Sequence, residues 1–582
     1  MKVLFQNLKK QDIVALLCTA VLVVVQVWLE LKMPDYTQKL TSAVSTGSIS
    51  MSDVMKNGGM MLLCALGSMA AAIAGGFFAS QLAANMARTL RSKLFNKISS
   101  FSSAEINHFT TPSLITRTTN DVVQVQNLLA MGLQMLLKAP ITAVWALMKI
   151  QSASMEWTMA TLITVGIIIV LLGSIVGLCF KKFRLIQKLT DQLNDATREN
   201  LTGVRVIRAF NAEEYQQKKF ARVNDDITNN QLFTSRTTGL MMPIMTICMN
   251  GLTLAIYFIG AILINQAAMA DKATIFGNMT AFTQYALQVV MSFMMVVAMF
   301  IILPRTMVSV KRIEEVLNTK PSITYPTQSV KTTGKGVLKF NHVSFSYSDD
   351  GKPVLSDISF TAESGETVAI IGATGSGKST LVNLIPRFYD VTSGSITLDG
   401  VDLREFPEKD LEARVSIAPQ KAILFAGDIA SNVTYGADHE SKDDDPRLKE
   451  ALDIAQAEFV ADLPEGIHAP VAQGGTNFSG GQKQRLSIAR AVYPEAEVVI
   501  FDDTFSALDY KTDMLVRKGL REKLSTTTVI LVAQRIGTIK NADKILVLDK
   551  GRIVGCGKHK ELLETCSVYH EIALSQLSKE GL

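Results

Sequence analysis

One short segment of the chain combines glycines, a lysine and hydroxyl groups at a spacing that suits phosphate binding. The segment Gly372-Ala-Thr-Gly-Ser-Gly-Lys-Ser-Thr380 has the pattern G-x-x-x-x-G-K-[ST], and it follows the apolar run 367–371, which is typical of a buried strand. The glycines allow backbone N–H groups to turn toward phosphates, and the N-terminus of the helix that follows favours their negative charge. Lys378 is expected to reach the β- and γ-phosphates, and Ser379 to bind Mg²⁺.

The residues expected to bind the phosphates are Gly372, Thr374, Gly375, Ser376, Gly377, Lys378, Ser379 and Thr380. A lone match to this pattern can also occur in a flexible turn that binds nothing. The strand before the segment and the helix after it favour the phosphate site.

A second apolar strand ends in two acids. The run 498–501 (Val-Val-Ile-Phe) leads directly into Asp502 and Asp503. Such a strand places a carboxylate beside the phosphate loop, where Asp502 can serve as a partner of Mg²⁺.

Between these two motifs lies Phe478-Ser-Gly-Gly-Gln482. The order of phosphate loop, Ser-Gly-Gly-Gln segment, apolar strand and acids resembles that of the ATP-binding cassette (ABC) family, and the resemblance covers nearly the whole chain. It implies ATP and Mg²⁺ as cofactors. Because these proteins sandwich ATP between two cassettes, it also implies that four residues contact the ATP of a second chain: Ser479, Gly480, Gly481 and Gln482.

The resemblance carries over to further positions. Tyr347 matches the aromatic residue that stacks on adenine, and Gln420 matches a glutamine that touches both Mg²⁺ and the transport domain. Asp509 matches the loop that crosses to the other cassette. Residues 117–122 and 203–210 look like the family's two cytoplasmic loops, which are typical of exporters rather than importers. Each position alone could be an ordinary core or turn residue.

The chain departs from the family's pattern at its hydrolytic residues. The family normally has a glutamate, the base that positions the attacking water, where this chain has Asp503, and the shorter side chain withdraws the carboxylate by about 1.5 Å. Gln534 replaces a histidine that contacts the γ-phosphate, and an amide cannot become a cation. Gln473 also replaces a usual glutamate. Asp503, Gln534 and Gln420 are the candidate catalytic residues. This pattern resembles the degenerate-site subunit of heterodimeric bacterial multidrug exporters.

The first half of the chain is expected to lie in a membrane. The chain has 582 residues, of which 48% are hydrophobic, and it is too long and too apolar for one soluble domain. Crossing a bilayer requires about 20 apolar residues. Suitable runs occur at 13–31, 60–78, 128–148, 159–180, 240–264 and 275–303.

The predicted fold class is that of an ABC exporter, with a membrane α-helical domain and an α/β nucleotide-binding domain. We expect the transmembrane domain at 1–315, a linker rich in Thr, Ser, Pro and Lys at 316–336, and the nucleotide-binding domain at 337–582. The charged, periodic stretches 88–127 and 181–236 predict helices that continue beyond the membrane on the cytoplasmic side.

The charges orient the membrane domain. Lys and Arg total 58 against 53 Asp and Glu, and the excess flanks the apolar runs, which favours the positive-inside rule over nucleic-acid binding. Basic residues precede the first span and follow the second, fourth and sixth. Both termini and the nucleotide-binding domain are therefore predicted to be cytoplasmic, with the chain in the plasma membrane. The six cysteines have no C-x-x-C spacing, which argues against a zinc site or a disulfide framework.

Three functions remain open at this stage. The preferred one is ATP-driven export of hydrophobic or amphipathic compounds, with a second half-transporter as partner and membrane lipids around the spans. The second is a homodimeric lipid or peptide exporter or flippase, which would require Asp503 to support hydrolysis. The third is a regulatory or gated-channel subunit, although the chain lacks a long regulatory insert. Polar span residues, of which Lys138 is the most informative, are expected to face a cavity or a neighbouring helix.

Overall fold

The structure is a computed structural model that describes residues 9–46, 50–151, 155–269, 271–328, 330, 332, 334–348, 351–437 and 445–576. The chain divides into two compact units, the first comprising Met1–Ile98 and Pro112–Thr319, and the second Ser99–Thr111 and Lys320–Leu582. Residues 99–111, expected in the membrane domain, thus group with the second unit. Helix α12 continues to Asn318, three residues into the expected linker.

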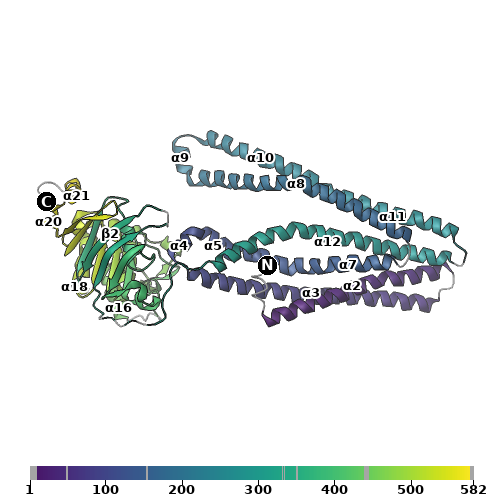
Figure 1. The fold of residues 1–582 in the computed structure, drawn as a ribbon, viewed down its shortest axis with the longest axis horizontal. Helices are drawn as coiled ribbons and strands as arrows, with labels where there is room; N and C mark the ends of the chain where they lie inside the picture. The colour runs from purple at the N-terminus through teal and green to yellow at the C-terminus, as the bar shows by residue number, and fades with distance from the viewer. Residues whose placement is uncertain are drawn as a thin grey trace. The chain divides into compact units, whose positions relative to one another are not determined.

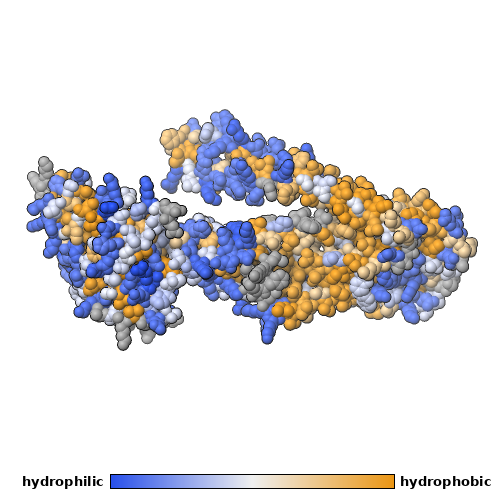
Figure 2. Space-filling view, in the orientation of Figure 1, coloured by the Kyte–Doolittle hydropathy of each residue, from blue (hydrophilic) through white to orange (hydrophobic). Residues whose placement is uncertain are grey.

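The first unit is built from long helices. Their bounds are α2 (Lys10–Ser45), α3 (Met51–Ser99), α5 (Thr111–Thr118), α6 (Asn120–Asn127), α7 (Leu133–Gln151), α8 (Met155–Thr202), α9 (Val204–Ala209), α10 (Glu213–Gly239), α11 (Met241–Gln266) and α12 (Lys272–Asn318). A π-helical turn, Leu128–Gly132, joins α6 to α7. Figure 2 shows hydrophobic side chains gathered over the middle of these helices, as a surface in contact with lipid requires.

Within the part of the chain that the structure describes, six helical segments are long and apolar enough to cross a membrane, which agrees with the predicted number. They are Lys10–Ser45, Met51–Ser99, Thr111–Gln151, Met155–Thr202, Glu213–Gln266 and Lys272–Val296. The 48 residues of α8 extend about 70 Å at 1.5 Å per residue, more than twice the hydrocarbon thickness of about 30 Å. Helices α8 and α10 run side by side and are joined by the short α9, in the region where residues 181–236 predicted such extensions (Figure 1).

Helix α12 packs against α2 and α7 in the core of this unit. Trp157 and Phe282 are fully buried there, with ring centroids 5.0 Å apart. Lys138 on α7 contacts the neighbouring helix α2, where its Nζ lies 2.8 Å from Glu30 Oε1. The same oxygen accepts hydrogen bonds from Gln26 Nε2 at 2.9 Å and Ser68 Oγ at 3.3 Å. Since polar groups inside a membrane are costly unless paired, this cluster ties α2, α3 and α7 together.

The segment 117–122 is hydrogen-bonded to the C-terminal part of α12. Arg117 Nη1 donates to Glu315 Oε2 at 2.7 Å and to the Arg312 carbonyl oxygen at 2.8 Å. Asp121 Oδ1 accepts a hydrogen bond from Ser309 Oγ at 2.8 Å. These bonds hold α5 and α6 against the last turns of α12.

The second unit contains two larger sheets. A four-stranded antiparallel sheet has the order β2-β1-β4-β5, and a six-stranded sheet has the order β12-β11-β3-β10-β9-β6, parallel except for β12. The strands are β1 (Leu338–Phe345), β2 (Leu355–Ala362), β3 (Thr367–Gly372), β4 (Ser393–Leu398), β5 (Val401–Asp402), β6 (Val415–Ala418), β9 (Val498–Asp502), β10 (Thr528–Val532), β11 (Lys544–Asp549) and β12 (Arg552–Gly557), with a small ladder of β7 (Gly427–Asp428) and β8 (Pro470–Val471). Every residue of β9 and β10 is buried, as expected of parallel strands covered on both faces.

The helices of this unit are α4 (Ser103–Phe109), α13 (Lys378–Asn383), α14 (Glu408–Arg414), α15 (Ile429–Val433), α16 (Pro446–Ile454), α17 (Gly480–Val492), α18 (Tyr510–Lys523), α19 (Ile536–Ile539), α20 (His559–Thr565) and α21 (Ser567–Gln576). Helix α4 belongs to this unit, and two of its residues bond to loop residues of the unit. Asn107 Nδ2 donates to Tyr389 Oη at 3.0 Å, and Glu105 Oε1 accepts from the Ser322 N–H at 3.1 Å.

Candidate functional site

A cavity of about 330 Å³ lies at the carboxyl ends of β3, β9 and β10, the edge of a parallel sheet where ligands bind in open α/β folds. Ten of the predicted site residues line it: Thr374, Gly375, Gly377, Lys378, Ser379, Thr380, Gln420, Asp502, Asp503 and Gln534. Val354 and Val532 also line it, and no sequence signal marked them because isolated valines resemble any other core residue.

The loop between β3 and α13 has a backbone that requires glycine. Gly375 and Gly377 have φ angles of 82° and 102°, in the left-handed region that other residues rarely adopt. A Cβ atom on Gly372 would lie 2.1 Å from the Leu548 carbonyl oxygen, so no side chain fits there. Ser376 is buried, and its Oγ has no hydrogen-bond partner among the residues that the structure describes. The sequence pattern therefore encodes a loop folded close to its neighbouring strand.

Lys378 begins α13 with its ammonium group folded onto the loop. Its Nζ donates to the carbonyl oxygens of Gly372 at 2.8 Å and Ala373 at 2.9 Å. Burial lowers the pKa of Lys378, and the charges of Asp503 and Asp502 oppose that shift. A partly desolvated ammonium held by two carbonyl groups is ready to be attracted by an anion such as a phosphate.

Ser379 and Asp502 form the part of the site that suits Mg²⁺. Ser379 Oγ donates to Asp502 Oδ1 at 3.1 Å, so a hydroxyl oxygen and a carboxylate oxygen lie next to each other in the cavity. Burial raises the pKa of Asp502, an effect that a nearby cation would reverse. Among the described residues, no group of three or more His, Cys, Asp and Glu could hold a metal ion. Mg²⁺ typically uses only one or two protein ligands beside substrate phosphates, and this pair fits that chemistry.

Asp503 follows β9 in a left-handed conformation, with φ of 50°, and its side chain is 8% exposed. Its Oδ2 accepts two hydrogen bonds, from Gln534 Nε2 at 2.8 Å and from Gln420 Nε2 at 3.3 Å. The three candidate catalytic residues therefore meet at a single oxygen atom. The sequence predicted these residues one by one, but not their convergence.

Tyr347 lies beside the cavity rather than in its lining. Its Oη is 3.0 Å from Thr380 Oγ1, and its ring packs edge-on against Phe345 and Tyr389. The side chain is 55% exposed, which leaves aromatic surface available for stacking with a base.

The other predicted nucleotide contacts lie outside this cavity. Ser479 caps α17, since its Oγ accepts from the Gln482 N–H at 3.3 Å while its own N–H donates to Gln482 Oε1 at 2.9 Å. Gly480 and Gly481 form the first turn of that helix. Asp509 caps α18 through Thr512, and these hydrogen bonds lower its pKa. Ser479, Gly480 and Asp509 are exposed, so both caps are open to contact from another molecule.

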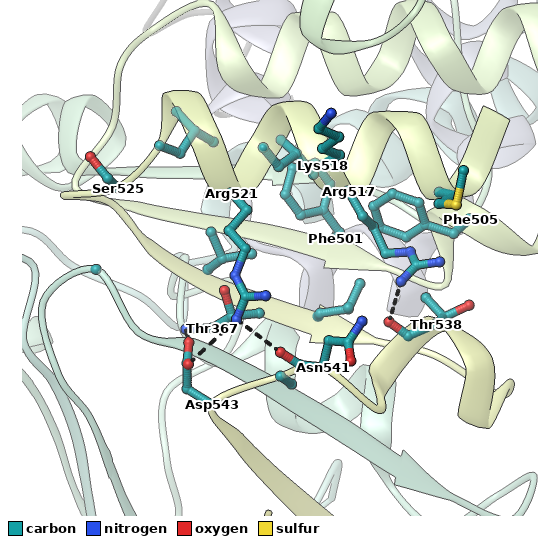
Figure 3. Close-up of a pocket in the computed structure, with 17 residues that line it drawn as sticks. Thr367, Phe501, Phe505, Arg517, Lys518, Arg521, Ser525, Thr538, Asn541 and Asp543 are labelled. Atoms are coloured by element: carbon teal, nitrogen blue, oxygen red, sulfur yellow. Dashed lines mark hydrogen bonds and ion pairs between the residues drawn. The ribbon is translucent and has the colours of Figure 1, made fainter. Parts of the chain in front are cut away.

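Another cavity, of about 350 Å³, lies between α18 and the six-stranded sheet and contains none of the predicted site residues (Figure 3). Its guanidinium groups are already bonded to the chain. Arg517 Nη1 donates to the Thr538 carbonyl oxygen at 3.2 Å, and Arg521 Nη2 donates to that of Asn541 at 3.1 Å and lies 3.7 Å from Asp543 Oδ1. Because its arginines already bond to the chain and no predicted site residue lines it, the candidate site is placed at the phosphate loop instead.

Comparisons with known proteins identify a family for a segment of each unit. Residues 13–293 match the family described as ABC transporter transmembrane region, and residues 355–506 match the family described as ABC transporter. An uncharacterized ABC transporter ATP-binding protein of Mycobacterium tuberculosis is 39% identical over 89% of this chain and 87% of its own. An ATP-dependent lipid A-core flippase of Hahella chejuensis is 30% identical over 94% of this chain and 92% of its own.

Among solved structures, a bacterial Atm1-family ABC exporter with ATP bound has a TM-score of 0.79, covering 98% of this chain and 99% of its own. The two sequences are 22% identical, so this similarity shows the fold alone.

Proposed function

Because the chain belongs to the ABC transporter family, as an exporter half-transporter that couples ATP to export, we propose that it is one half of a heterodimer that exports hydrophobic or amphipathic compounds. In this proposal its own ATP site binds nucleotide but hydrolyses it slowly. Ser379, Asp502 and Gln420 would hold Mg²⁺, which supplies positive charge beside the phosphates. Its Ser-Gly-Gly-Gln segment completes a faster site on the partner.

The arrangement around Asp503 carries this proposal. A general base must come within hydrogen-bond reach of the water it activates, and the Asp503 carboxylate is about 1.5 Å shorter in reach than a glutamate. Its Oδ2 already accepts hydrogen bonds from Gln534 and Gln420, so an attacking water would have to compete with two amides for this oxygen. Gln534 cannot supply the positive charge that a protonated histidine would give to a phosphate. Binding groups are thus retained while the hydrolytic groups are weakened.

Two substitutions restore the family's residues and test the proposal. In the purified full-length complex, Asp503→Glu together with Gln534→His should raise vanadate trapping of labelled nucleotide on this chain by about 10- to 100-fold, because a displacement of about 1 Å costs on the order of 100-fold in rate. The exposed Asp462→Glu is the matched control and should leave trapping unchanged. Equal trapping on both chains of the unmodified complex would contradict the slow site.

A homodimeric lipid flippase is the second candidate, and the lipid A-core flippase relative, which aligns over 94% of this chain, favours it. In that case the chain purified alone would form a dimer and hydrolyse ATP at a rate typical of exporters. Under the heterodimer proposal, the chain alone should show little ATPase activity.

A further inference from the structure

The last helix of the second unit bonds directly to the segment that carries Gln534. Helix α21 ends at Gln576, whose side-chain amide makes two hydrogen bonds to backbone groups. Gln576 Nε2 donates to the Gln534 carbonyl oxygen at 2.7 Å, and Gln576 Oε1 accepts from the Ile536 N–H at 2.8 Å. One side-chain amide therefore bonds to the backbone on both sides of Arg535.

The dipeptide 534–535 connects β10, which ends at Val532, to the short helix α19, which begins at Ile536. Gln534 and Arg535 are exposed, so packing does little to fix their conformation. The Gln534 side chain nevertheless has a definite task, because its Nε2 donates to Asp503 Oδ2 at 2.8 Å. A rotation of the backbone at Gln534 would aim this amide away from the ATP cavity.

Helix α21, which carries Gln576, is itself anchored in the second unit. Tyr569 and Ala573, on its inner face, are fully buried. His559 Nδ1, at the start of α20, lies 2.7 Å from Tyr569 Oη and joins the two helices. Gln576 is therefore held by an element packed into the core of the second unit, and its bonds transmit that position to Gln534.

We infer that Gln576 is a positioning residue for the ATP site, which acts by holding the backbone of Gln534 so that the Gln534 amide points at Asp503. This inference rests on the assignment of Gln534 to the ATP site, as proposed above, but not on the site being slow. Gln576 itself does not line the cavity and touches no reacting atom.

A double-mutant cycle tests this role in the full-length assembled transporter. The variants are Gln576→Ala, Gln534→Ala and the double variant, and the readout is the rate of nucleotide trapping on this chain over a range of ATP concentrations, which reports turnover and KM at this site alone. Gln576→Ala should lower turnover at this site by about fivefold, with KM changed less than about twofold, since two hydrogen bonds are lost without change to the phosphate contacts. In the Gln534→Ala background the same substitution should have no further effect.

Ser575→Ala is the matched control, because Ser575 Oγ bonds within α21, to the Ile572 carbonyl oxygen at 2.8 Å. Gln576→Glu keeps the size of the side chain and the acceptor for Ile536, but loses the donor to Gln534, and it should lower turnover at least as far as Gln576→Ala. Unchanged turnover in both Gln576 variants, or an equal loss in both backgrounds, would overturn the inference.

The two proposals fail separately. If Asp503→Glu with Gln534→His does not raise trapping while the Gln576 and Gln534 effects remain coupled, the slow-site proposal fails and the positioning role stands. If trapping rises in that variant but Gln576→Ala does not change turnover at this site, the slow-site proposal stands and the positioning role fails.

Discussion

The residues that meet at Asp503 come from three separate segments, and two of them bond to the same carboxylate oxygen. Gln420 follows β6, Asp503 follows β9 and Gln534 follows β10, and both amides donate to Asp503 Oδ2. Beside them in the same cavity lie Lys378, Ser379 and Asp502, which are proposed to bind phosphate and Mg²⁺. At this scale the residues match the family's pattern at the positions expected to bind nucleotide and depart from it at the positions expected to hydrolyse it, which is the basis of the slow-site proposal.

Lys378 is the residue on which nucleotide affinity should depend most. Replacing it by alanine removes the only cation that lines the described cavity, and charge-assisted bonds to phosphate are about twice as strong as neutral ones. We expect Lys378→Ala to weaken binding of a fluorescent ATP analogue to the full-length protein by at least about 30-fold.

The matched control for this prediction is Lys339→Ala, an exposed lysine on β1 whose removal should leave affinity unchanged. If Lys378→Ala and Lys339→Ala bound the analogue equally well, the phosphate loop would not be the ATP site.

Among the elements, α2, α3 and α7 are tied together by the cluster around Glu30. The side chains of Glu30 and Lys138 are 27% and 22% exposed, so the pair is mostly shielded by protein. Three donors from these helices meet on Glu30 Oε1. The cluster therefore fixes how the helices are rotated relative to one another, which apolar side chains alone specify poorly in a membrane.

Removing one charge of the Glu30–Lys138 pair should destabilise the protein more than removing both. Lys138→Ala leaves the Glu30 carboxylate without its cation and should destabilise the protein by about 1–3 kcal/mol, whereas Glu30→Gln combined with Lys138→Met should recover most of that loss. Thermal unfolding in detergent measures both. The exposed Lys188→Ala on α8 is the control. Equal losses in the single and double variants would show that the unpaired Glu30 carboxylate is not the cause of the lost stability.

For the whole molecule, the position of the Ser-Gly-Gly-Gln segment implies a second chain. Ser479 and Gly480 are exposed, and none of residues 479–482 lines the chain's own cavity. ABC exporters form dimers, and a second cassette would bring its phosphates to these exposed caps. The two places proposed to contact ATP are therefore separate within this chain and can be tested separately.

Substitutions at the two places should have unequal effects in the assembled exporter. Ser479→Arg should lower the ATPase activity of the complex by about 100-fold, because it blocks the partner's site, whereas Asp503→Asn should lower it by less than about twofold. The exposed turn variant Ser364→Arg is the control. Equal losses from Ser479→Arg and Asp503→Asn would instead indicate two equivalent sites, as in a homodimer.

Several features were predictable because they depend on residues near each other in the chain. The phosphate loop follows from glycines that must adopt positive φ angles, and the cap of α17 from a serine and a glutamine three residues apart. The six spans follow from apolar runs of sufficient length, although the helices extend beyond them. The grouping of residues 99–111 with the second unit was not predictable, because it depends on bonds from Asn107 and Glu105 to residues more than 200 positions away.

The sequence by itself determined the class of protein, the phosphate loop and the replacement of the usual base by Asp503. These depend on local backbone geometry and on the length of apolar runs. Only the tertiary structure decided that Gln420 and Gln534, 83 and 31 residues away, share one oxygen of Asp503, and that Gln576 holds Gln534 in place. The physical reason is that strand order and helix packing set which distant side chains meet, and the spacing of residues along the chain does not encode that order.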